Sequence, residues 1–191
     1  MPKGRSGNWN FNGKDPDGHA VEVVQYEPAG WSVRERGRFL PAERVSARML
    51  HLGILVGSLG RSLAFYHGIL GFQETWRGTR DPKALSWVNV RVPEGSDYIE
   101  LMLYKELPAE TSRGSQHHIA LEVPDMDAAL RWPTPRALAT GYRRPLEVRT
   151  GVNRRRQLNL FDPDGTRTEL MEPRTVDGLA PPVSAAPPPI P

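Results

Sequence analysis

Two histidine–glutamate couples recur along the chain at almost the same interval. His51 is followed by Glu100, and His118 is followed by Glu169. Each histidine opens an apolar run typical of a strand, and each glutamate lies inside a later apolar run. Two imidazoles and two carboxylates, delivered by equivalent strands of a repeated unit, could therefore converge on one divalent ion.

The composition limits the kind of metal site and the kind of partner. The 191 residues include no cysteine, so the strong ligands available are His, Asp and Glu, which suit Ni, Zn, Co, Mn or Fe(II). The net charge of +3 is slight, and the basic residues are not interleaved with aromatic ones, which argues against nucleic acid. There is no apolar run long enough for a membrane span, and the first residues lack a signal segment. We expect a cytoplasmic protein with a small-molecule substrate and no membrane partner.

Both ends of the chain and one internal segment lack the pattern of a folded unit. Residues 1–7 are small and basic, and residues 174–191 are rich in proline and alanine, so we expect both ends to be disordered. Residues 28–47 are basic and carry no clear period, and we interpret them as a linker.

Residues 8–27 repeat the end of a later segment. The turn Asp15-Pro-Asp-Gly is followed by a strand-like run that contains Glu22, and Asp162-Pro-Asp-Gly is followed at the same offset by Glu169. We therefore interpret residues 8–27 as the terminal hairpin of a partial unit, whose first strand and helix are missing. A hairpin that adds to a sheet edge, within the chain or in a neighbour, is the alternative.

The segment 48–173 predicts an α+β fold made of two βαβββ modules, 48–107 and 114–173. In the first module we expect strands at 49–56, 72–77, 85–92 and 97–104 and a helix that begins after Ser58 and stops at Gly71. In the second we expect strands at 117–123, 142–149, 156–161 and 166–171 and a helix over 125–139, in which Pro133 and Pro135 should produce a kink.

Three segments resemble the vicinal oxygen chelate superfamily: Leu63–Phe72, Gln116–Val123 and Leu160–Met171. This group contains glyoxalase I, extradiol dioxygenases, methylmalonyl-CoA epimerase and the resistance proteins for fosfomycin and bleomycin. The resemblance implies that the paired modules form an eight-stranded, half-open barrel with a metal ion inside. In that family the ligands come from the first and fourth strands of each module.

Carried onto this chain, the resemblance implies that His51, Glu100, His118 and Glu169 are metal ligands. Their order is most similar to metal-dependent glyoxalase I, a lactoylglutathione lyase, in which two coordination positions stay open for substrate. We expect Glu169, or symmetrically Glu100, to remove a proton from the carbon next to a metal-bound carbonyl.

The expected substrate contacts differ from those of glyoxalase I. Bacterial enzymes of that kind grip glutathione with an Arg and an Asn at the positions of Leu55 and Tyr104, which speaks against glutathione and for a more apolar or aromatic substrate. Tyr104 shares a strand face with Glu100 and is expected to line the cavity. In the basic run before the third strand, Arg154 and Arg156 are candidates for binding a carboxylate or phosphate.

Three functions stay open at this point. The first is a glyoxalase I-like enzyme with isomerase or lyase chemistry on a small oxygenated substrate. The second is an Fe(II) ring-cleaving dioxygenase of the extradiol type, and the third is a ligand-binding protein of the bleomycin-resistance type. Four ligands favour the two enzymes. The superfamily closes its barrel either within one chain or across a dimer, so a homodimer also stays open.

Overall fold

The structure is a computed structural model that describes residues 3–114, 116–132 and 141–189 of the chain. The chain divides into two compact units, Met1–Arg44 and Val45–Pro191. The boundary between them falls inside the segment 28–47 that the sequence indicates as a linker.

The first unit contains a two-stranded antiparallel hairpin, β1 (Trp9–Lys14) and β2 (Ala20–Gln25), and one short helix, α1 (Trp31–Arg34). The hairpin turn is organised by Asp15, whose Oδ1 accepts hydrogen bonds from two backbone N–H groups of the turn. Gly18 has a φ of 89°, a left-handed conformation that favours glycine. A hairpin is therefore present where the repeated turn motif predicts one.

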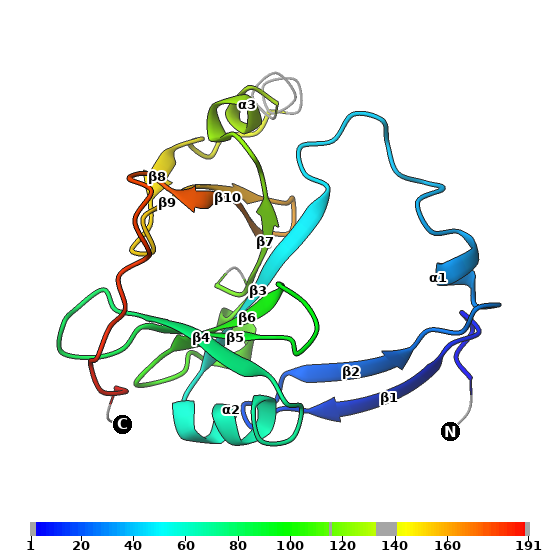
Figure 1. Ribbon diagram of the computed structural model, residues 1–191, viewed down its shortest axis with the longest axis horizontal. Coiled ribbons are helices and arrows are strands. Elements are labelled where there is room, and N and C mark those ends of the chain that lie inside the picture. Colours follow the sequence, from blue (N-terminus) through cyan, green and yellow to red (C-terminus); the bar gives the residue numbers. More distant parts are fainter. Residues whose placement is uncertain (1–2, 115, 133–140, 190–191) are drawn as a thin grey trace. The chain divides into compact units, whose positions relative to one another are not determined.

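The second unit is built on an eight-stranded sheet among the described residues. Its strands are β3 (Arg48–Val56), β4 (Gln73–Gly78), β5 (Trp87–Arg91), β6 (Tyr98–Leu103), β7 (His118–Glu122), β8 (Val148–Thr150), β9 (Arg155–Phe161) and β10 (Arg167–Thr175). They lie in the order β4-β5-β6-β3-β7-β10-β9-β8. The antiparallel pair β3·β7 joins the two modules within one chain, while β3·β6 and β7·β10 are parallel. The sheet is the expected half-open barrel, with β4 and β8 as its edges (Figure 1).

Each module carries one α-helix after its first strand: α2 (Leu59–Tyr66) and α3 (Met126–Arg131). Ser58 caps α2 as predicted, and Asp125 caps α3 by accepting a hydrogen bond from a backbone N–H in the first turn. The predicted helix over 125–139 is described only to Arg131, and the prolines at 133 and 135 lie outside the described residues. In the described part of the chain, every helix is too short or too polar to traverse a bilayer.

Strand alternation separates the core from the inner face of the sheet. On β3, Ile54 and Val56 pack with α2 in the core of the first module, whereas His51 and Gly53 point to the other face. On β10, Leu170 packs with α3 in the core of the second module, and its neighbour Glu169 lies on the opposite face. The helices thus cover the outer face and leave the inner face for a site.

One predicted strand is much shorter than expected. The sequence predicts a strand over 142–149, but β8 spans only Val148–Thr150, where it pairs with β9. The residues before it, Tyr142–Glu147, form no ladder. Their Arg-Arg-Pro run explains this, because proline cannot donate a ladder hydrogen bond.

The proline-rich tail, expected to be disordered, runs along the first module in the structure (Figure 1). The backbone N–H of Ser184 donates to the carbonyl of Arg77 at 3.0 Å, and that of Leu85 donates to the carbonyl of Pro187 at 2.8 Å. Ala186 packs against the core of the first module. The tail therefore attaches in two ways: Ser184, which is not a proline, donates its N–H, and the carbonyl of Pro187 accepts.

Candidate metal centre

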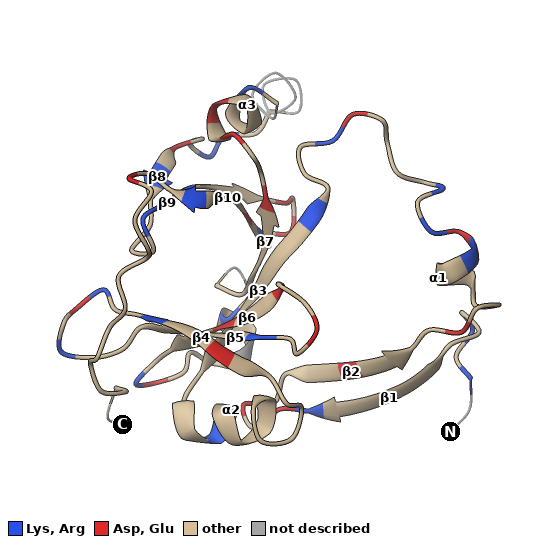
Figure 2. Ribbon diagram, viewed as in Figure 1, with Lys and Arg blue, Asp and Glu red and all other residues tan. Residues whose placement is uncertain are grey.

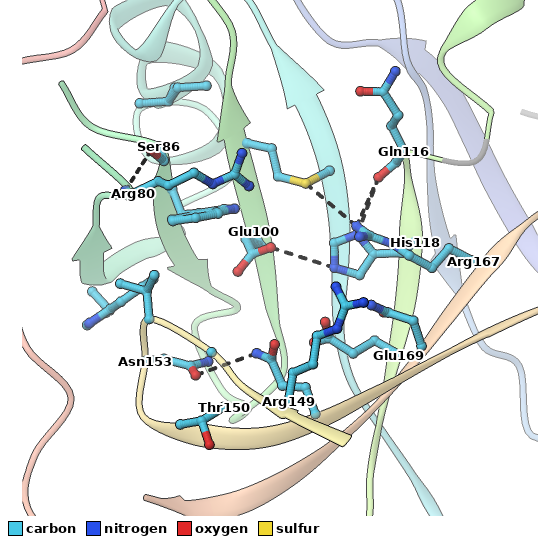
Figure 3. Close-up of a pocket in the computed structure, with 18 of the residues that line it drawn as sticks. Arg80, Ser86, Glu100, Gln116, His118, Arg149, Thr150, Asn153, Arg167 and Glu169 are labelled. Carbon is cyan, nitrogen blue, oxygen red and sulfur yellow. Dashed lines mark hydrogen bonds and ion pairs between the residues drawn. The ribbon is translucent and has the colours of Figure 1, made fainter. Parts of the chain in front are cut away.

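Four neighbouring strands in the middle of the sheet each direct one side chain to the same region: His51 from β3, Glu100 from β6, His118 from β7 and Glu169 from β10. Figure 3 shows the last three of these side chains beside the cavity. The two imidazole Nε2 atoms are 3.0 Å apart. The Nε2 of His118 lies 3.6 Å from Oε2 of Glu100, and the Nε2 of His51 lies 3.9 Å from Oε1 of Glu169. The structure therefore brings the two couples together and places each histidine next to the glutamate of the other module.

Three of these side chains have donor atoms within 4.8 Å of one another: His51, Glu100 and His118. Two ligands about 2.1 Å from one ion and at right angles are about 3.0 Å apart, which is the separation of the two imidazoles. Glu169 lies just outside this close set. The donors are nitrogen and carboxylate oxygen, so the residues fit a divalent ion such as Ni, Zn, Co, Mn or Fe(II).

Gly53 makes room for the second imidazole. It lies directly opposite His118 in the β3·β7 ladder, and a Cβ at this position would overlap the ring of His118. The ring therefore rests on the bare backbone of β3. A glycine inside a strand often marks such a close approach.

Burial raises the pKa of both carboxyl groups. The pKa of Glu100 is raised to about 8 by burial and by the charge of Glu169, with Arg167 opposing the shift. The pKa of Glu169 is raised to about 7 by burial, again opposed by Arg167. Without a bound cation, both groups thus hold much of their proton near neutrality.

Burial has the reverse effect on the imidazoles. It lowers the pKa of His51 well below its ordinary value, helped by the charges of His118 and Arg167. Burial and Arg167 lower the pKa of His118 to about 3. Both imidazoles are therefore neutral at physiological pH, the form that binds metal ions.

Nδ1 of His118 has two contacts, the carbonyl of Gln116 at 3.5 Å and Nη2 of Arg167 at 2.5 Å, and we assign the ring protons from the shorter one. The Nη2 of Arg167 lies 2.5 Å from Nδ1 of His118, and because arginine can only donate, this nitrogen accepts. The proton of His118 is then on Nε2, which donates to Nε2 of His51. His51 in turn carries its proton on Nδ1, a buried atom without a hydrogen-bond partner among the described residues. His51 is in the tautomer that binds an ion through Nε2, whereas His118 must move its proton to Nδ1 and release Arg167.

A cavity of about 760 Å³ opens in front of these side chains. Its lining includes Glu100, His118 and Glu169, four aromatic residues (Trp76, Trp87, Tyr104, Phe161) and four arginines (Arg80, Arg144, Arg149, Arg167). His51 is completely buried behind His118. The cavity has the size of a small-molecule site, with polar groups at its floor.

The two predicted substrate residues of the first module have different positions. Tyr104 lines the cavity, and its hydroxyl donates to Oε1 of Gln116 at 2.9 Å. Leu55 is completely buried and is not among the described residues that line the cavity. Tyr104 is therefore available to a ligand, whereas Leu55 is not.

Arg154 and Arg156, the other two predicted substrate residues, are not among the described lining residues either. Arg154, with a φ of 61°, lies in the β8–β9 turn, and its Nη1 is 3.0 Å from Oδ2 of Asp177. Arg156 pairs with Asp127 and Glu172 on the helix-covered side of the sheet. The structure thus engages both arginines in ion pairs away from the cavity.

Other residues of the site were missed at the level of sequence. Arg167 precedes Glu169 by two positions, so strand alternation alone could have placed it on the same face. Asn89 and Asn159 lie directly opposite Glu100 and Glu169 in their ladders, a relation that appears only once the strand register is known. Each candidate carboxylate therefore has an asparagine as its cross-strand neighbour.

Two βαβββ modules in one chain, joined at their first strands around an open cavity, define the class of paired-module half-barrels. Residues 48–170 match the family model of the Glyoxalase/Bleomycin resistance protein/Dioxygenase superfamily, and the chain belongs to this superfamily. None of the curated proteins compared with the chain matched it.

Several solved structures share the fold. Methylmalonyl-CoA epimerase from Mycobacterium tuberculosis is 24% identical, with a TM-score of 0.55, and the match covers 72% of this chain and 95% of that one. A variant of Streptomyces coelicolor methylmalonyl-CoA epimerase is 19% identical, with a TM-score of 0.51, covering 72% and 99%. A hypothetical protein from Bacillus halodurans C-125 is 18% identical, with a TM-score of 0.50, covering 66% and 94%. These likenesses establish the architecture.

Proposed function

We propose that this protein is a metal-dependent enzyme of the glyoxalase type, with isomerase or lyase chemistry on a small oxygenated substrate. The observation that carries the proposal is the convergence of two buried imidazoles and two carboxyl groups at the floor of an open cavity. Buried groups of this kind are expensive unless they are paired or bind a metal. Membership of the superfamily supports the same conclusion.

His51, Glu100 and His118 hold the ion in this proposal, because their donor atoms form the close set. When bound, the ion supplies Lewis-acid polarisation of a substrate carbonyl and thereby acidifies the neighbouring carbon. The tautomer of His51 is already correct for this role. The aromatic lining of the cavity offers contacts for an apolar part of the substrate.

Glu169 is the proposed base. It lines the cavity and lies outside the close set of donors, so its carboxylate stays available to accept and return a proton when an ion is bound. Glu169 takes the proton from the carbon next to the carbonyl and returns it to the same or the adjacent carbon. In a lyase reaction, the electron pair left on carbon expels a leaving group instead.

The test is exchange of substrate hydrogen with solvent. Protein loaded with Ni²⁺, Zn²⁺, Co²⁺ or Mn²⁺ is incubated in D₂O with 2-hydroxy ketones, 2-hydroxy acids, and the methylglyoxal hemithioacetals of glutathione and of a simple thiol. Loss of the proton next to the carbonyl is followed by NMR. We expect exchange for at least one class and a decrease of about 100-fold or more in Glu169→Gln.

A matched control is Glu22→Gln, the equivalent position in the hairpin of the first unit, where the exposed carboxylate accepts a hydrogen bond from Asn10. Glu22→Gln should exchange like the wild type, and Glu169→Gln should still bind about one ion per chain. Equal exchange in Glu169→Gln and the wild type would exclude Glu169 as the base.

A second candidate function is supported by the close set itself. Two histidines and one carboxylate are the ligands of non-haem Fe(II) oxygenases, so His51, His118 and Glu100 also fit a ring-cleaving dioxygenase. Anaerobic loading with Fe²⁺, followed by oxygen uptake with catechols, separates the two functions. Uptake that survives Glu169→Gln favours the dioxygenase, because only the first mechanism needs Glu169 as a base.

A further inference from the structure

Arg167 brings a guanidinium next to His118 and Glu169 in the candidate metal centre (Figure 3). Its Nη2 contacts Nδ1 of His118 at 2.5 Å, the backbone carbonyl of Gln116 at 3.2 Å and Sδ of Met102 at 4.0 Å. Its Nε is buried and has no hydrogen-bond partner among the described residues. The charge also has no carboxylate within ion-pair distance in the described part of the chain. A buried donor without an acceptor costs free energy unless a ligand satisfies it.

The fold itself does not require a cation here. In the β7·β10 ladder Arg167 lies opposite His118, and in the β3·β6 ladder the equivalent residue opposite His51 is Tyr98. Tyr98 stacks on the ring of His51 with a centroid distance of 4.8 Å. Two equivalent positions thus hold a neutral aromatic residue in one module and an arginine in the other. The difference points to a role in binding.

Among the residues that the structure describes, the donors of Arg167 lack an acceptor that carries a negative charge. The Nε–H and one Nη2–H of a guanidinium are parallel and match the two oxygens of a carboxylate. In Arg167, Nε has no acceptor and Nη2 has only a neutral ring nitrogen, a carbonyl and a sulfur. Arg167 is one of the residues that line the cavity, together with Glu169 and His118.

The rest of the cavity is also suited to an anion. Arg80, Arg144 and Arg149 line it together with Arg167, and basic residues mark β8, β9 and β10 (Figure 2). Arg80 and Arg144 lie over aromatic rings, with 5.4 Å and 4.0 Å to the ring centroids. The only acidic lining residues in the described part are the two carboxyl groups of the metal centre. A small anion is therefore drawn towards the site.

We propose that Arg167 binds a carboxylate group of the substrate, so that the substrate is a small carboxylic acid with a carbonyl or hydroxyl oxygen next to its carboxylate. The assignment of this ligand as a substrate rests on the proposed function, whereas the carboxylate site rests on Arg167 alone. The carboxylate supplies an acceptor for Nε and replaces the neutral acceptors of Nη2.

The test compares acids with their amides, which differ in the carboxylate and little else. Binding of mandelate and mandelamide, and of lactate and lactamide, is measured by ligand-observed NMR on wild-type protein in EDTA. We expect the acid to bind about 10- to 100-fold more tightly than the amide. Arg167→Gln should abolish this preference, and Arg167→Lys should keep part of it because it retains the charge without the planar fork.

Arg154→Gln is the matched control, because it removes the same charge from an arginine outside the cavity, and it should keep the preference. Circular dichroism checks that the variants are folded. Any one of three results would overturn the proposal. The wild type binds acid and amide equally, it binds neither pair at about 10 mM, or the preference for the acid survives Arg167→Gln.

Metal content, measured on the same samples, separates this inference from the proposed function. Removing a positive charge next to His118 should leave ion binding intact or strengthen it, so Arg167→Gln is expected to bind at least as much Zn²⁺ as the wild type. Failure of the wild type to bind ions defeats the enzyme proposal and leaves the carboxylate site standing. A wild type that binds ions normally but shows no preference for the acid defeats the carboxylate site and leaves the enzyme proposal standing.

Discussion

Binding of a divalent ion at pH 7.0 should release more than one proton from the protein. The protons come from Glu100 and Glu169, whose pKa values are raised to about 8 and about 7. At pH 7.0 the first group is about 90% protonated and the second about half protonated, so ionising both releases about 1.4 protons. The imidazoles release none, because burial keeps them neutral in the metal-free protein.

The raised pKa of Glu100 also lowers the affinity for the ion at neutral pH. Raising the pKa of Glu100 from 4.5 to about 8 corresponds to about 5 kcal/mol against its ionised form, which the ion must offset when it binds. Affinity should therefore rise steeply from pH 6 to pH 8 and level off above about pH 8, where both carboxyl groups are already ionised.

Calorimetric titration with Zn²⁺ in buffers of different ionisation enthalpy measures the proton count. We expect about 1.4 protons at pH 7.0 and about 0.3 at pH 8.5 for the wild type, and about 0.5 at pH 7.0 for Glu100→Gln. Glu22→Gln, at an exposed carboxylate, should match the wild type. If all four groups had ordinary pKa values, ion binding at pH 7.0 would release no protons from the carboxyl groups and about 0.5 protons from the two imidazoles together. A wild-type value of about 0.5 or less, unchanged in Glu100→Gln, would refute the reasoning.

Three further predictions concern packing and stability. Gly53→Ala should push the ring of His118 away and weaken ion binding by about 10-fold or more. The control Gly60→Ala, in open space on α2, should leave ion binding unchanged and raise stability by up to about 1 kcal/mol. Equal ion affinities of Gly53→Ala and the wild type would contradict this prediction. Removing the chain after residue 180 should lower the unfolding free energy by about 1–3 kcal/mol in urea, because the backbone contact of Leu85 and the packing of Ala186 are lost, and an unchanged midpoint would contradict this. The metal-free protein should be most stable between about pH 4.5 and 6.5. The carboxyl groups have raised pKa values, so their contribution to stability is lost as the pH rises from about 4.5 through about 8. The imidazoles have lowered pKa values, so their contribution to stability is lost as the pH falls below about 6.5. Urea unfolding in EDTA from pH 3.5 to 9 checks the window, and a maximum above pH 8 would be inconsistent with it.

The sequence predicts the sheet well because its signals are local. Alternating apolar residues, the Ser58 cap and the Asp162 turn each act within a few positions, and together they define the order of the strands. The convergence of His51, Glu100, His118 and Glu169 also follows, because equivalent strands of two modules meet at the centre of one sheet. Period-two alternation then puts all four on the face away from the helices.

The remainder of the site depends on contacts between segments far apart in the chain. Arg154 and Arg156 were expected at the cavity from their place in a basic run, but acidic partners elsewhere engage them, and these partners cannot be inferred from the run itself. The need for glycine at position 53 depends on which residue of β7 lies opposite, and that is a matter of register. The tail contacts depend on free backbone donors along the first module, for which the proline-rich segment gives no signal.

Ion stoichiometry tests the central claim most directly. Purified protein is equilibrated with Zn²⁺ or Ni²⁺, dialysed, and measured by atomic mass spectrometry, with His51→Ala, His118→Ala and Glu22→Gln treated in the same way. The convergent geometry predicts about one ion per chain in the wild type and Glu22→Gln and almost none in the two histidine variants. A wild type without bound ions, or histidine variants that bind as much as the wild type, would contradict it.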